Sequence, residues 1–346
     1  MTSPTNMKRI LLLALLTLLP DLAQAEWAFQ QSKVGTNISF RAVQAVSSKV
    51  VWVGGSSGTV LCTVNSGQTW ENRSVSGAEQ LDFRGVAAFD SLTAIVMSAG
   101  ESEKGQAKIY RTTDGGKNWQ LVFQIAEKGV FLDGVAFWDK RNGLVLGDPI
   151  AGKWFILKTA DGGQSWLRLA PDNLPPMLPN EAAFAASNSS LLLQDRSNVW
   201  IGSGGANRTR VFHSTDRGRT WLVSDTPLPS GESSGIFGLR FWDSRNVIAV
   251  GGDHKKEKES SENVIVTSDG GRTWRKGAAT DPSGLKESVV MLSGKTLLAV
   301  GPSGTCLSKD FGKSWQKIDL SPFHAASCVE GHCWAVGAKG VVANWK

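Results

Sequence analysis

Long apolar runs, recognisable nucleotide motifs and clustered basic residues are missing from most of this 346-residue chain. Beyond residues 10–19, no apolar stretch approaches the ~20 residues that a membrane-spanning helix needs. Phosphate loops, dinucleotide fingerprints and nucleophile elbows do not occur in the contexts that they require, so no cofactor is predicted. The formal net charge is +6, but the basic residues are scattered, and nucleic-acid binding is therefore not expected.

The N-terminal residues have the three parts of a secretory signal. A basic pair at residues 8–9 precedes the apolar residues 10–19, and small residues at 23–25 supply a cleavage site. We expect cleavage after Ala25 and a mature, periplasmic or secreted protein that starts at Glu26. Because no cysteine follows that would carry a lipid anchor, membrane contact is expected only through a partner.

One short pattern, Ser/Thr-x-Asp-x-Gly-x-Ser/Thr/Asn-Trp, returns along most of the chain. Its aspartates are Asp114, Asp161, Asp216, Asp269 and Asp310, and its tryptophans are Trp70, Trp119, Trp166, Trp221, Trp274 and Trp315. The first copy departs from the pattern, with Asn65 and Ser66. Aspartate accepts hydrogen bonds from the backbone ahead of it and glycine supplies positive φ, so each copy predicts a tight turn between two strands. Residues that recur in every repeat are assigned to its structure rather than to catalysis or metal binding.

The repeat tryptophans return every 41 to 55 residues, which is the period of a four-stranded propeller blade. A further second-strand pattern at 333–337 adds a seventh unit. We therefore predict an all-β, seven-bladed β-propeller with four-stranded antiparallel blades, which occupies residues 26–346 as a single domain. The last unit lacks a fourth strand, and residues 26–30 resemble the missing one. The N-terminal strand, with Trp27 in the repeat position, is expected to close the ring by pairing with the C-terminal blade.

The turn pattern resembles the BNR or Asp-box repeat of sialidases and related propellers. Over nearly the entire mature chain, the arrangement is most similar to the photosystem II stability/assembly factor-like family of seven-bladed propellers. This resemblance implies that the turns lie away from the ligand face. It also implies recognition on the opposite face and a non-enzymatic, monomeric scaffold that helps to assemble or stabilise an exported or membrane protein.

One position at the start of the innermost strands is charged or titratable in six of seven blades. Alignment on the Gly that ends each second strand gives Arg41, Arg84, Asp133, Glu181, Phe237, Glu287 and His324. We expect these residues to line a channel mouth, with cations on one arc and carboxylates on another. The alternative is that channel water merely solvates them. In the first interpretation Arg41 and Arg84 dock carboxylate groups of a partner, and His324 with the carboxylates sets its orientation.

Loops between second and third strands add two Gly-Asp steps, at Asp148 and at Asp253 followed by His254. They are expected to form a polar rim around the mouth, or alternatively tight loops capped by aspartate.

A carbohydrate-binding or glycoside hydrolase propeller of sialidase-like type is the alternative function. The sialidase resemblance implies a tyrosine nucleophile, whereas the single tyrosine, Tyr110, precedes a repeat turn on the outer side of a blade. A two-carboxylate hydrolase stays open, because several acidic residues are expected around the channel at separations that the sequence does not give. These residues are Asp133, Asp148, Glu181 and Asp253. No catalytic residue is assigned.

The four cysteines fall into two classes. Cys328 and Cys333 flank a predicted hairpin tip and are expected to form a disulfide in an oxidising compartment. Cys62 and Cys306 lie on third strands of blades that are not neighbours, so both are expected to be free and buried. A metal cluster that combines the first pair with His324 and His332 would distort the hairpin, and no metal site is predicted.

Overall fold

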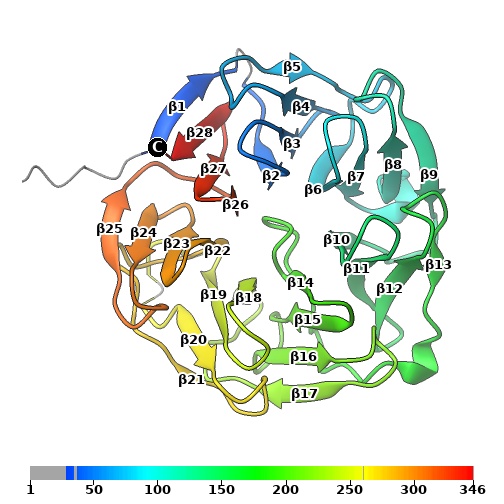
Figure 1. Cartoon of the computed structure of the whole chain (residues 1–346). Helices are drawn as coiled ribbons and strands as arrows, with labels where there is room; N and C mark the ends of the chain where they lie inside the picture. Colours follow the sequence, from blue (N-terminus) through cyan, green and yellow to red (C-terminus); the bar gives the residue numbers. More distant parts are fainter. Residues whose placement is uncertain (1–28, 35–36, 260, 346) are drawn as a thin grey trace, which may run out of the picture.

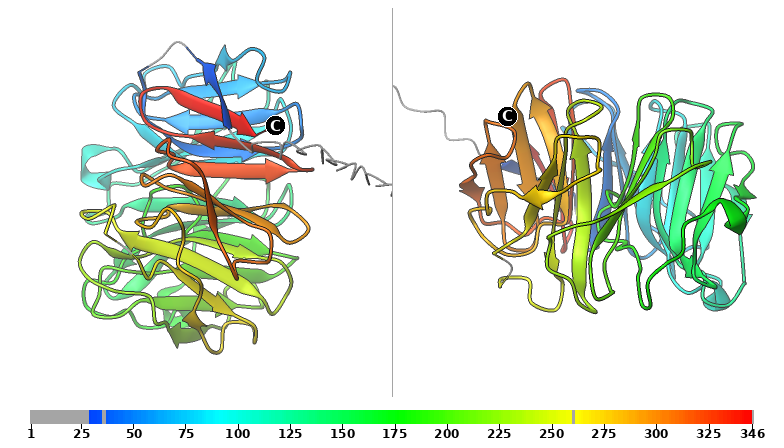
Figure 2. Two further views of the ribbon diagram at one scale, coloured as in Figure 1. Left: turned by 90° about the vertical axis from the view of Figure 1, so that its left-hand side faces the viewer. Right: turned by 90° about the horizontal axis from the view of Figure 1, so that it is seen from below.

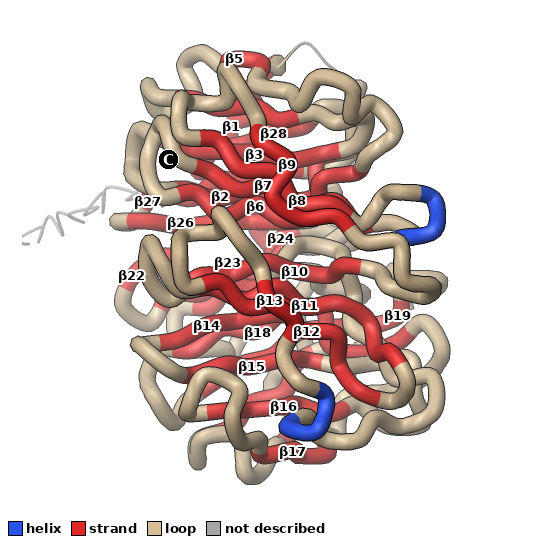
Figure 3. Tube along the Cα trace, turned by 90° about the vertical axis from the view of Figure 1, so that its right-hand side faces the viewer, coloured by secondary structure: helices blue, strands red, loops and turns tan. Residues whose placement is uncertain are grey.

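In the computed structural model, which describes residues 29–34, 37–259 and 261–345, seven four-stranded antiparallel sheets surround a central channel (Figure 1). The predicted seven-bladed propeller is therefore confirmed. In each blade the strands follow one another from the channel to the rim. Two short 3-10 helices, η1 (Ser102–Lys104) and η2 (Pro171–Asn173), lie in loops outside the sheets (Figure 3). Within these described residues, no helix is long and apolar enough to cross a membrane.

The strands fall into four classes by their distance from the channel. The innermost strands are β2 (Phe40–Ala45), β6 (Asp82–Ala88), β10 (Leu132–Phe137), β14 (Leu191–Gln194), β18 (Ser234–Phe241), β22 (Ser288–Ser293) and β26 (Ala325–Val329). The second strands are β3 (Val51–Gly55), β7 (Ala94–Ala99), β11 (Gly143–Ile150), β15 (Asn198–Gly202), β19 (Val247–Asp253), β23 (Thr296–Val300) and β27 (His332–Val336). The third strands are β4 (Val60–Thr63), β8 (Lys108–Thr112), β12 (Lys153–Thr159), β16 (Arg210–Ser214), β20 (Val264–Thr267), β24 (Thr305–Ser308) and β28 (Val341–Trp345). The outer strands are β5 (Glu71–Asn72), β9 (Gln120–Gln124), β13 (Leu167–Arg168), β17 (Leu222–Asp225), β21 (Arg275–Lys276), β25 (Gln316–Asp319) and β1 (Phe29–Lys33).

The hydrophobic core lies between the blades. Second strands such as β3 and β7 are buried along their whole length, because neighbouring sheets cover both of their faces. Trp52 of the first blade packs in one cluster with Phe83 and Val96 of the second blade, and Ile95 packs in the next cluster with Val145 of the third. The outer strands β5, β13 and β21 are exposed. The continuous apolar runs of the second strands follow from this arrangement.

The N-terminal strand closes the ring, as predicted. β1 pairs antiparallel with β28, from Phe29 opposite Trp345 to Lys33 opposite Val341. Figure 2 shows β1 in dark blue beside β28 in red. The last sheet therefore contains strands from both ends of the chain, which leaves neither end as an unpaired edge between blades. Trp27 and the predicted signal at residues 1–25 lie outside the described residues.

The repeat turns are held by a local network of hydrogen bonds. In the second blade, Thr112 Oγ1 donates to Asp114 Oδ1 over 2.8 Å and accepts from the Gly116 N–H over 2.9 Å. Asp114 also accepts from the Asn118 N–H over 3.0 Å, and these hydrogen bonds lower the pKa of its exposed carboxyl to about 2. The turns therefore use their aspartates to hold the backbone.

The irregular first turn forms the same network with an amide in place of the carboxylate. Asn65 Oδ1 accepts from Thr63 Oγ1 over 2.9 Å and from the Thr69 N–H over 3.0 Å. The turn geometry therefore depends on the acceptor oxygen at this position more than on its charge.

The repeat turns lie on the face opposite the starts of the inner strands. The Gly162 N–H donates to the Arg141 carbonyl over 2.9 Å, and the Gly115 N–H to the Leu92 carbonyl over 2.9 Å. Each contact joins a repeat turn to a turn that connects a first strand with a second strand. Both kinds of turn therefore share one face, which we call the Asp-box face; the other face is the mouth face.

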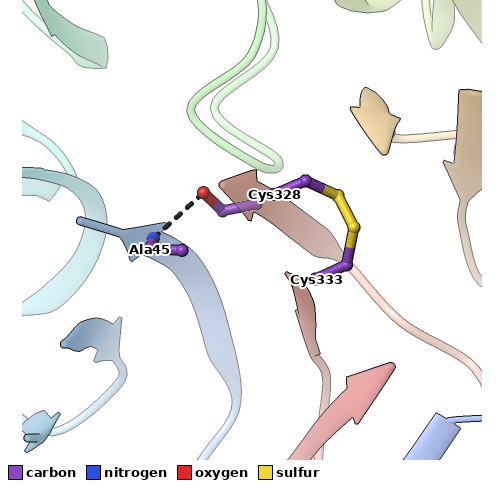
Figure 4. Close-up of a disulfide and its surroundings, with 4 residues drawn as sticks. Ala45, Cys328 and Cys333 are labelled. Carbon is purple, nitrogen blue, oxygen red and sulfur yellow. Dashed lines mark hydrogen bonds between the residues drawn. A yellow bond between two sulfur atoms is a disulfide. The ribbon is translucent and has the colours of Figure 1, made fainter. Parts of the chain in front are cut away.

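A disulfide joins Cys328 of β26 to Cys333 of β27, beside Ala45 of β2 (Figure 4). The Ala45 N–H donates over 3.0 Å to Oγ of Ser327, the residue before Cys328. The bond thus lies in the blade that closes the ring, where that blade meets the first one. Cys62 and Cys306 are buried, free thiols, and burial raises the pKa of each to about 12.

Candidate functional site

The position that carries the predicted mouth residues is a β-bulge. In four blades the pairing of the first and second strands shifts by one residue near the start of the inner strand. The residues in these bulges are Arg41, Arg84, Asp133 and Phe237. Glu287 and His324 immediately precede β22 and β26, and their N–H groups donate to second-strand carbonyls over 2.9 and 2.7 Å. Because a bulge redirects one side chain out of the alternating pattern, it explains polar residues at the start of otherwise apolar strands.

Glu181 does not occupy this position, so the predicted register does not hold for the fourth blade. Its inner strand, β14, starts only at Leu191. The Glu181 carboxylate accepts from Ser203 Oγ over 2.6 Å and from Arg210 Nε over 2.9 Å, and its residue is buried. The alignment failed because residues 182–190, which follow Glu181, turn into the channel instead of forming a longer inner strand.

Residues 182–190, which we call the plug segment, connect blades across the channel. In Figure 1 this green segment reaches from β14 toward the centre of the ring. Asn188 Oδ1 accepts from the Val135 N–H over 2.8 Å, and Asn188 Nδ2 donates to the Val86 carbonyl over 3.3 Å. Ser187 Oγ donates to the Glu287 carbonyl over 2.6 Å. Contacts with the second, third and sixth blades thus fix the segment behind the mouth.

One charged cluster lies where the first, sixth and seventh blades meet. His324 Nδ1 is 2.7 Å from Glu287 Oε2, and Arg41 Nη1 is 3.8 Å from Glu287 Oε1. The Glu287 side chain is only 5% exposed, whereas the Arg41 side chain is 26% exposed. Glu287 therefore holds His324 at close range, and the longer contact leaves the Arg41 guanidinium accessible at the mouth.

A second charged cluster lies between the second and third blades. Arg84 Nε is 2.7 Å from Asp82 Oδ2, and Arg84 Nη1 donates to the Ala185 carbonyl of the plug segment over 3.3 Å. The Arg84 side chain remains 30% exposed. Asp82, a carboxylate outside the predicted set, thus pairs with Arg84 among the cations of the seventh, first and second blades.

Asp133, which is buried, and Asp148, which is half-buried, form a carboxyl pair near Arg84. Burial first, and then the charge of Asp148, raise the pKa of Asp133 well above its ordinary range, although Arg84 opposes this effect. Asp133 Oδ2 is buried and has no hydrogen-bond partner among the residues that the structure describes. Burial raises the pKa of Asp148 to about 6, while the Ala183 N–H donates to its Oδ1 over 3.3 Å and opposes the rise. The pair therefore favours at least one protonated carboxyl.

Of the two other predicted rim residues, His254 lies beside an aromatic pair and Asp253 holds its own loop. Phe237 stacks on Phe184 of the plug segment, with ring centroids 4.2 Å apart, and the His254 ring meets Phe184 edge-on at 5.8 Å. Asp253 accepts from the Lys255 N–H over 2.8 Å, so it caps its loop in the manner of the alternative stated above. Asp148 and Asp253 therefore differ in role, although both follow a glycine.

Sequence reasoning missed the plug segment. Residues 171–180, which contain four prolines, come shortly before it, and the polar run 187–190 precedes the three leucines of β14. A serine and asparagine run beside an inner strand is the signal that would have indicated it, because such side chains readily bond to the backbone of neighbouring strands.

The fold and its repeated turns define the class of protein, a BNR/Asp-box repeat propeller. The family model for the BNR/Asp-box repeat matches residues 110–121. The chain is 25% identical over 334 residues to the photosystem II assembly lipoprotein Ycf48 of a Picosynechococcus species, covering 84% of this chain and 89% of the relative. This protein is thus a propeller related to the photosystem II assembly factor Ycf48.

Solved structures show the same fold. A structure of YCF48 bound to a D1 peptide has a TM-score of 0.65 and 16% identity, covering 92% of this chain and 96% of that one. YCF48 from Cyanidioschyzon merolae has a TM-score of 0.65 and 17% identity, with 92% and 98% covered. U3-55K is also similar, with a TM-score of 0.64, 11% identity, and 92% and 97% covered. Differently named proteins therefore share this architecture with the YCF48 structures. The fold alone does not identify the function, which depends on the residues of the site.

Proposed function

We propose that this protein is an exported, non-enzymatic scaffold that binds a carboxylate-bearing segment of an exported or membrane protein at its channel mouth. The observation that carries the proposal is the placement of Arg41 and Arg84. They occupy the same bulge position on adjacent blades, and their side chains are 26% and 30% exposed. Guanidinium groups bind carboxylates through two parallel hydrogen bonds, so two of them on one rim suit an acidic peptide segment.

The rest of the mouth suits recognition of an extended segment. The plug segment lies behind the mouth, and its half-buried Phe184, which stacks on the buried ring of Phe237, supplies an apolar group. The Ycf48 structure with a bound D1 peptide supports a peptide as the occupant of a propeller with this architecture. His324 and Glu287 orient the partner in this proposal, and Arg41 and Arg84 supply most of the attraction.

Two of the four candidate carboxyl groups do not suit the glycoside hydrolase alternative. A two-carboxylate mechanism needs both carboxyl groups against the scissile bond. Asp133 is 1% exposed, and Glu181 is 4% exposed and engaged with Arg210. Neither carboxyl group is open to a sugar. Export, with cleavage after Ala25, remains part of the proposal; the mass of the mature protein from the exporting cell tests it.

The mouth is tested by crosslinking in the exporting cell, with the mature protein as bait and mass spectrometry of the captured proteins. The wild-type bait is compared with a mouth variant that carries Arg41→Glu and Arg84→Glu together. A matched control carries Lys117→Glu and Arg219→Glu, which make the same change of charge at exposed residues of two repeat turns on the Asp-box face. Thermal melting of all three proteins checks that the folds are equivalent.

We expect one membrane or exported protein to be captured by the wild type and the control but lost from the mouth variant. Equal capture by all three proteins would show that the mouth is not the binding face. Loss from the control alone would move the interface to the Asp-box face.

A further inference from the structure

A second, separate site is suggested by the channel on the far side of the plug segment. An inner pocket of about 280 Å³ is bounded by the plug segment at Ser187 and Ser189. An outer pocket of about 440 Å³ extends to Asp139 and Lys140, in a turn on the Asp-box face. Both pockets are lined by Gln44 and by other shared residues, so they form one continuous space, which we call the channel cavity. Its size is within the range of pockets that hold small molecules.

Arg240 of β18 lines the inner pocket without a charged partner. Among the residues that the structure describes, no carboxylate forms an ion pair with it. Its Nε is buried and has no hydrogen-bond partner in the described part of the chain, and its guanidinium carbon lies 5.3 Å from the centroid of the Phe241 ring. Burial accordingly lowers the pKa of Arg240. An ionised group that is taken out of water without a counter-charge is costly, and an anion in the inner pocket would offset this cost.

The other polar groups of the inner pocket also favour an anion. Gln44 Oε1 accepts from the Ala88 N–H over 3.1 Å, which leaves its Nε2 group to donate. Ser327 Oγ accepts from the Ala45 N–H over 3.0 Å and keeps its own proton for another acceptor. Among the described residues that line this pocket, none is Asp or Glu. The inner pocket thus presents one cation and at least two spare donors, with no negative side chain.

Most of the side chains that line the outer pocket are apolar. Phe89, Phe137 and Trp138 line it together with leucines of β14. Among the described residues that line it, Asp139 alone is acidic, and it already accepts from the N–H groups of Arg141 and Asn142 over 2.8 and 2.9 Å. A ligand that fits both pockets therefore needs an anionic end and an apolar body.

We propose that the channel cavity binds a small amphipathic carboxylic acid that enters from the Asp-box face. The carboxylate lies against the Arg240 guanidinium, and the hydrocarbon part packs against Phe137 and the β14 leucines. The plug segment forms the inner end of this site, and it separates the site from the mouth. The proposal does not depend on the function proposed for the mouth.

Isothermal titration of the mature protein with 4-phenylbutyrate and octanoate tests the site, with 4-phenylbutyramide as the uncharged match of the first probe. We expect the acids to bind about tenfold or more tightly than the amide, because charge-assisted hydrogen bonds exceed neutral ones. Arg240→Gln should weaken binding of the acids by a similar factor and leave the weak binding of the amide unchanged. Arg219→Gln, at an exposed residue of a repeat turn, is the matched control and should change neither.

A second variant tests the apolar part without altering the charge. Ala136→Leu adds a side chain at the wall of the outer pocket and should weaken both acids and the amide. Equal affinities of acid and amide, or full affinity in Arg240→Gln, would overturn the proposal. The proposal would also be overturned if neither acid showed saturable binding at millimolar concentrations. This includes the outcome in which a peptide with a free C-terminus binds and the small acids do not.

Discussion

Replacement of Asp148 by asparagine should make this protein more stable at neutral pH. Asp148 is largely buried beside Asp133, and burial raises its pKa from an ordinary 3.8 to about 6. Its ionised form is therefore disfavoured in the folded state, and folding stability from this group falls as the pH rises from about 4 through 6. A shift of this size corresponds to about 2–3 kcal/mol above pH 7. Asparagine avoids this loss, because its amide oxygen can still accept from the Ala183 N–H.

The assay is urea unfolding of wild type and Asp148→Asn, followed by tryptophan fluorescence at several pH values between 4 and 8. The two proteins should be nearly equal at pH 4 and diverge by about 2–3 kcal/mol in unfolding free energy by pH 7.5. The Asp-box carboxyl groups, whose pKa values are lowered, titrate below this range in both proteins and cancel in the difference. A difference that does not change with pH, or a variant less stable at pH 7.5, would refute the reasoning.

Asp253→Asn is the matched control, because Asp253 also follows a glycine at the end of a second strand. Slight burial acts to raise the pKa of Asp253, but hydrogen bonds from Ser233, the Lys255 N–H and Ser234 outweigh it, and the pKa is lowered. The pKa shift of Asp253 is therefore opposite in sign to that of Asp148. The control variant should be less stable than the wild type above pH 4, and the two should converge as the pH falls through the lowered pKa.

Two further predictions concern the repeat turns and the closure of the ring. Asp161→Asn should melt within a few degrees of the wild type, because Asn65 already forms the same network in the first turn. Asp161→Ala removes the acceptor and should lower the free energy of unfolding by about 1–2 kcal/mol, measured by thermal unfolding. Equal melting temperatures for both variants would contradict this account. Deletion of residues 26–31 should lower the melting temperature of the mature protein, because it removes Phe29 to Gln31 from the pairing of β1 with β28; unchanged melting would mean that closure contributes little to stability.

The two proposed sites divide the channel between them. The mouth presents Arg41 and Arg84 to a protein partner, and the channel cavity presents Arg240 to a small acid on the other side of the plug segment. Ser187 and Ser189 of the plug segment bond to the carbonyl of Glu287, and both line the inner pocket. The plug segment is the structural link between the two proposals.

The sequence by itself determined the repeat unit, because the groups that form it are close along the chain. In the third blade, the Ser165 N–H and the Thr159 hydroxyl both bond to Asp161, and these residues are only a few positions apart. Such a turn is encoded locally and can be recognised by its pattern. The period of the turns then indicated four strands in each blade, and the second-strand pattern at 333–337 supplied the seventh blade. The N-terminal fourth strand followed because the last unit lacked one.

The polar position at the start of the inner strands was also visible in the sequence, but its environment was not. The contact of Arg41 with Glu287, the burial of Asp133 and the lack of an ion pair for Arg240 among the described residues all depend on strands from several blades. Glu181 was misplaced for the same reason, because only contacts across the channel bring residues 182–190 between the blades. Charge and burial at the centre of a propeller are set by residues far apart in the chain, and only the tertiary structure decided them.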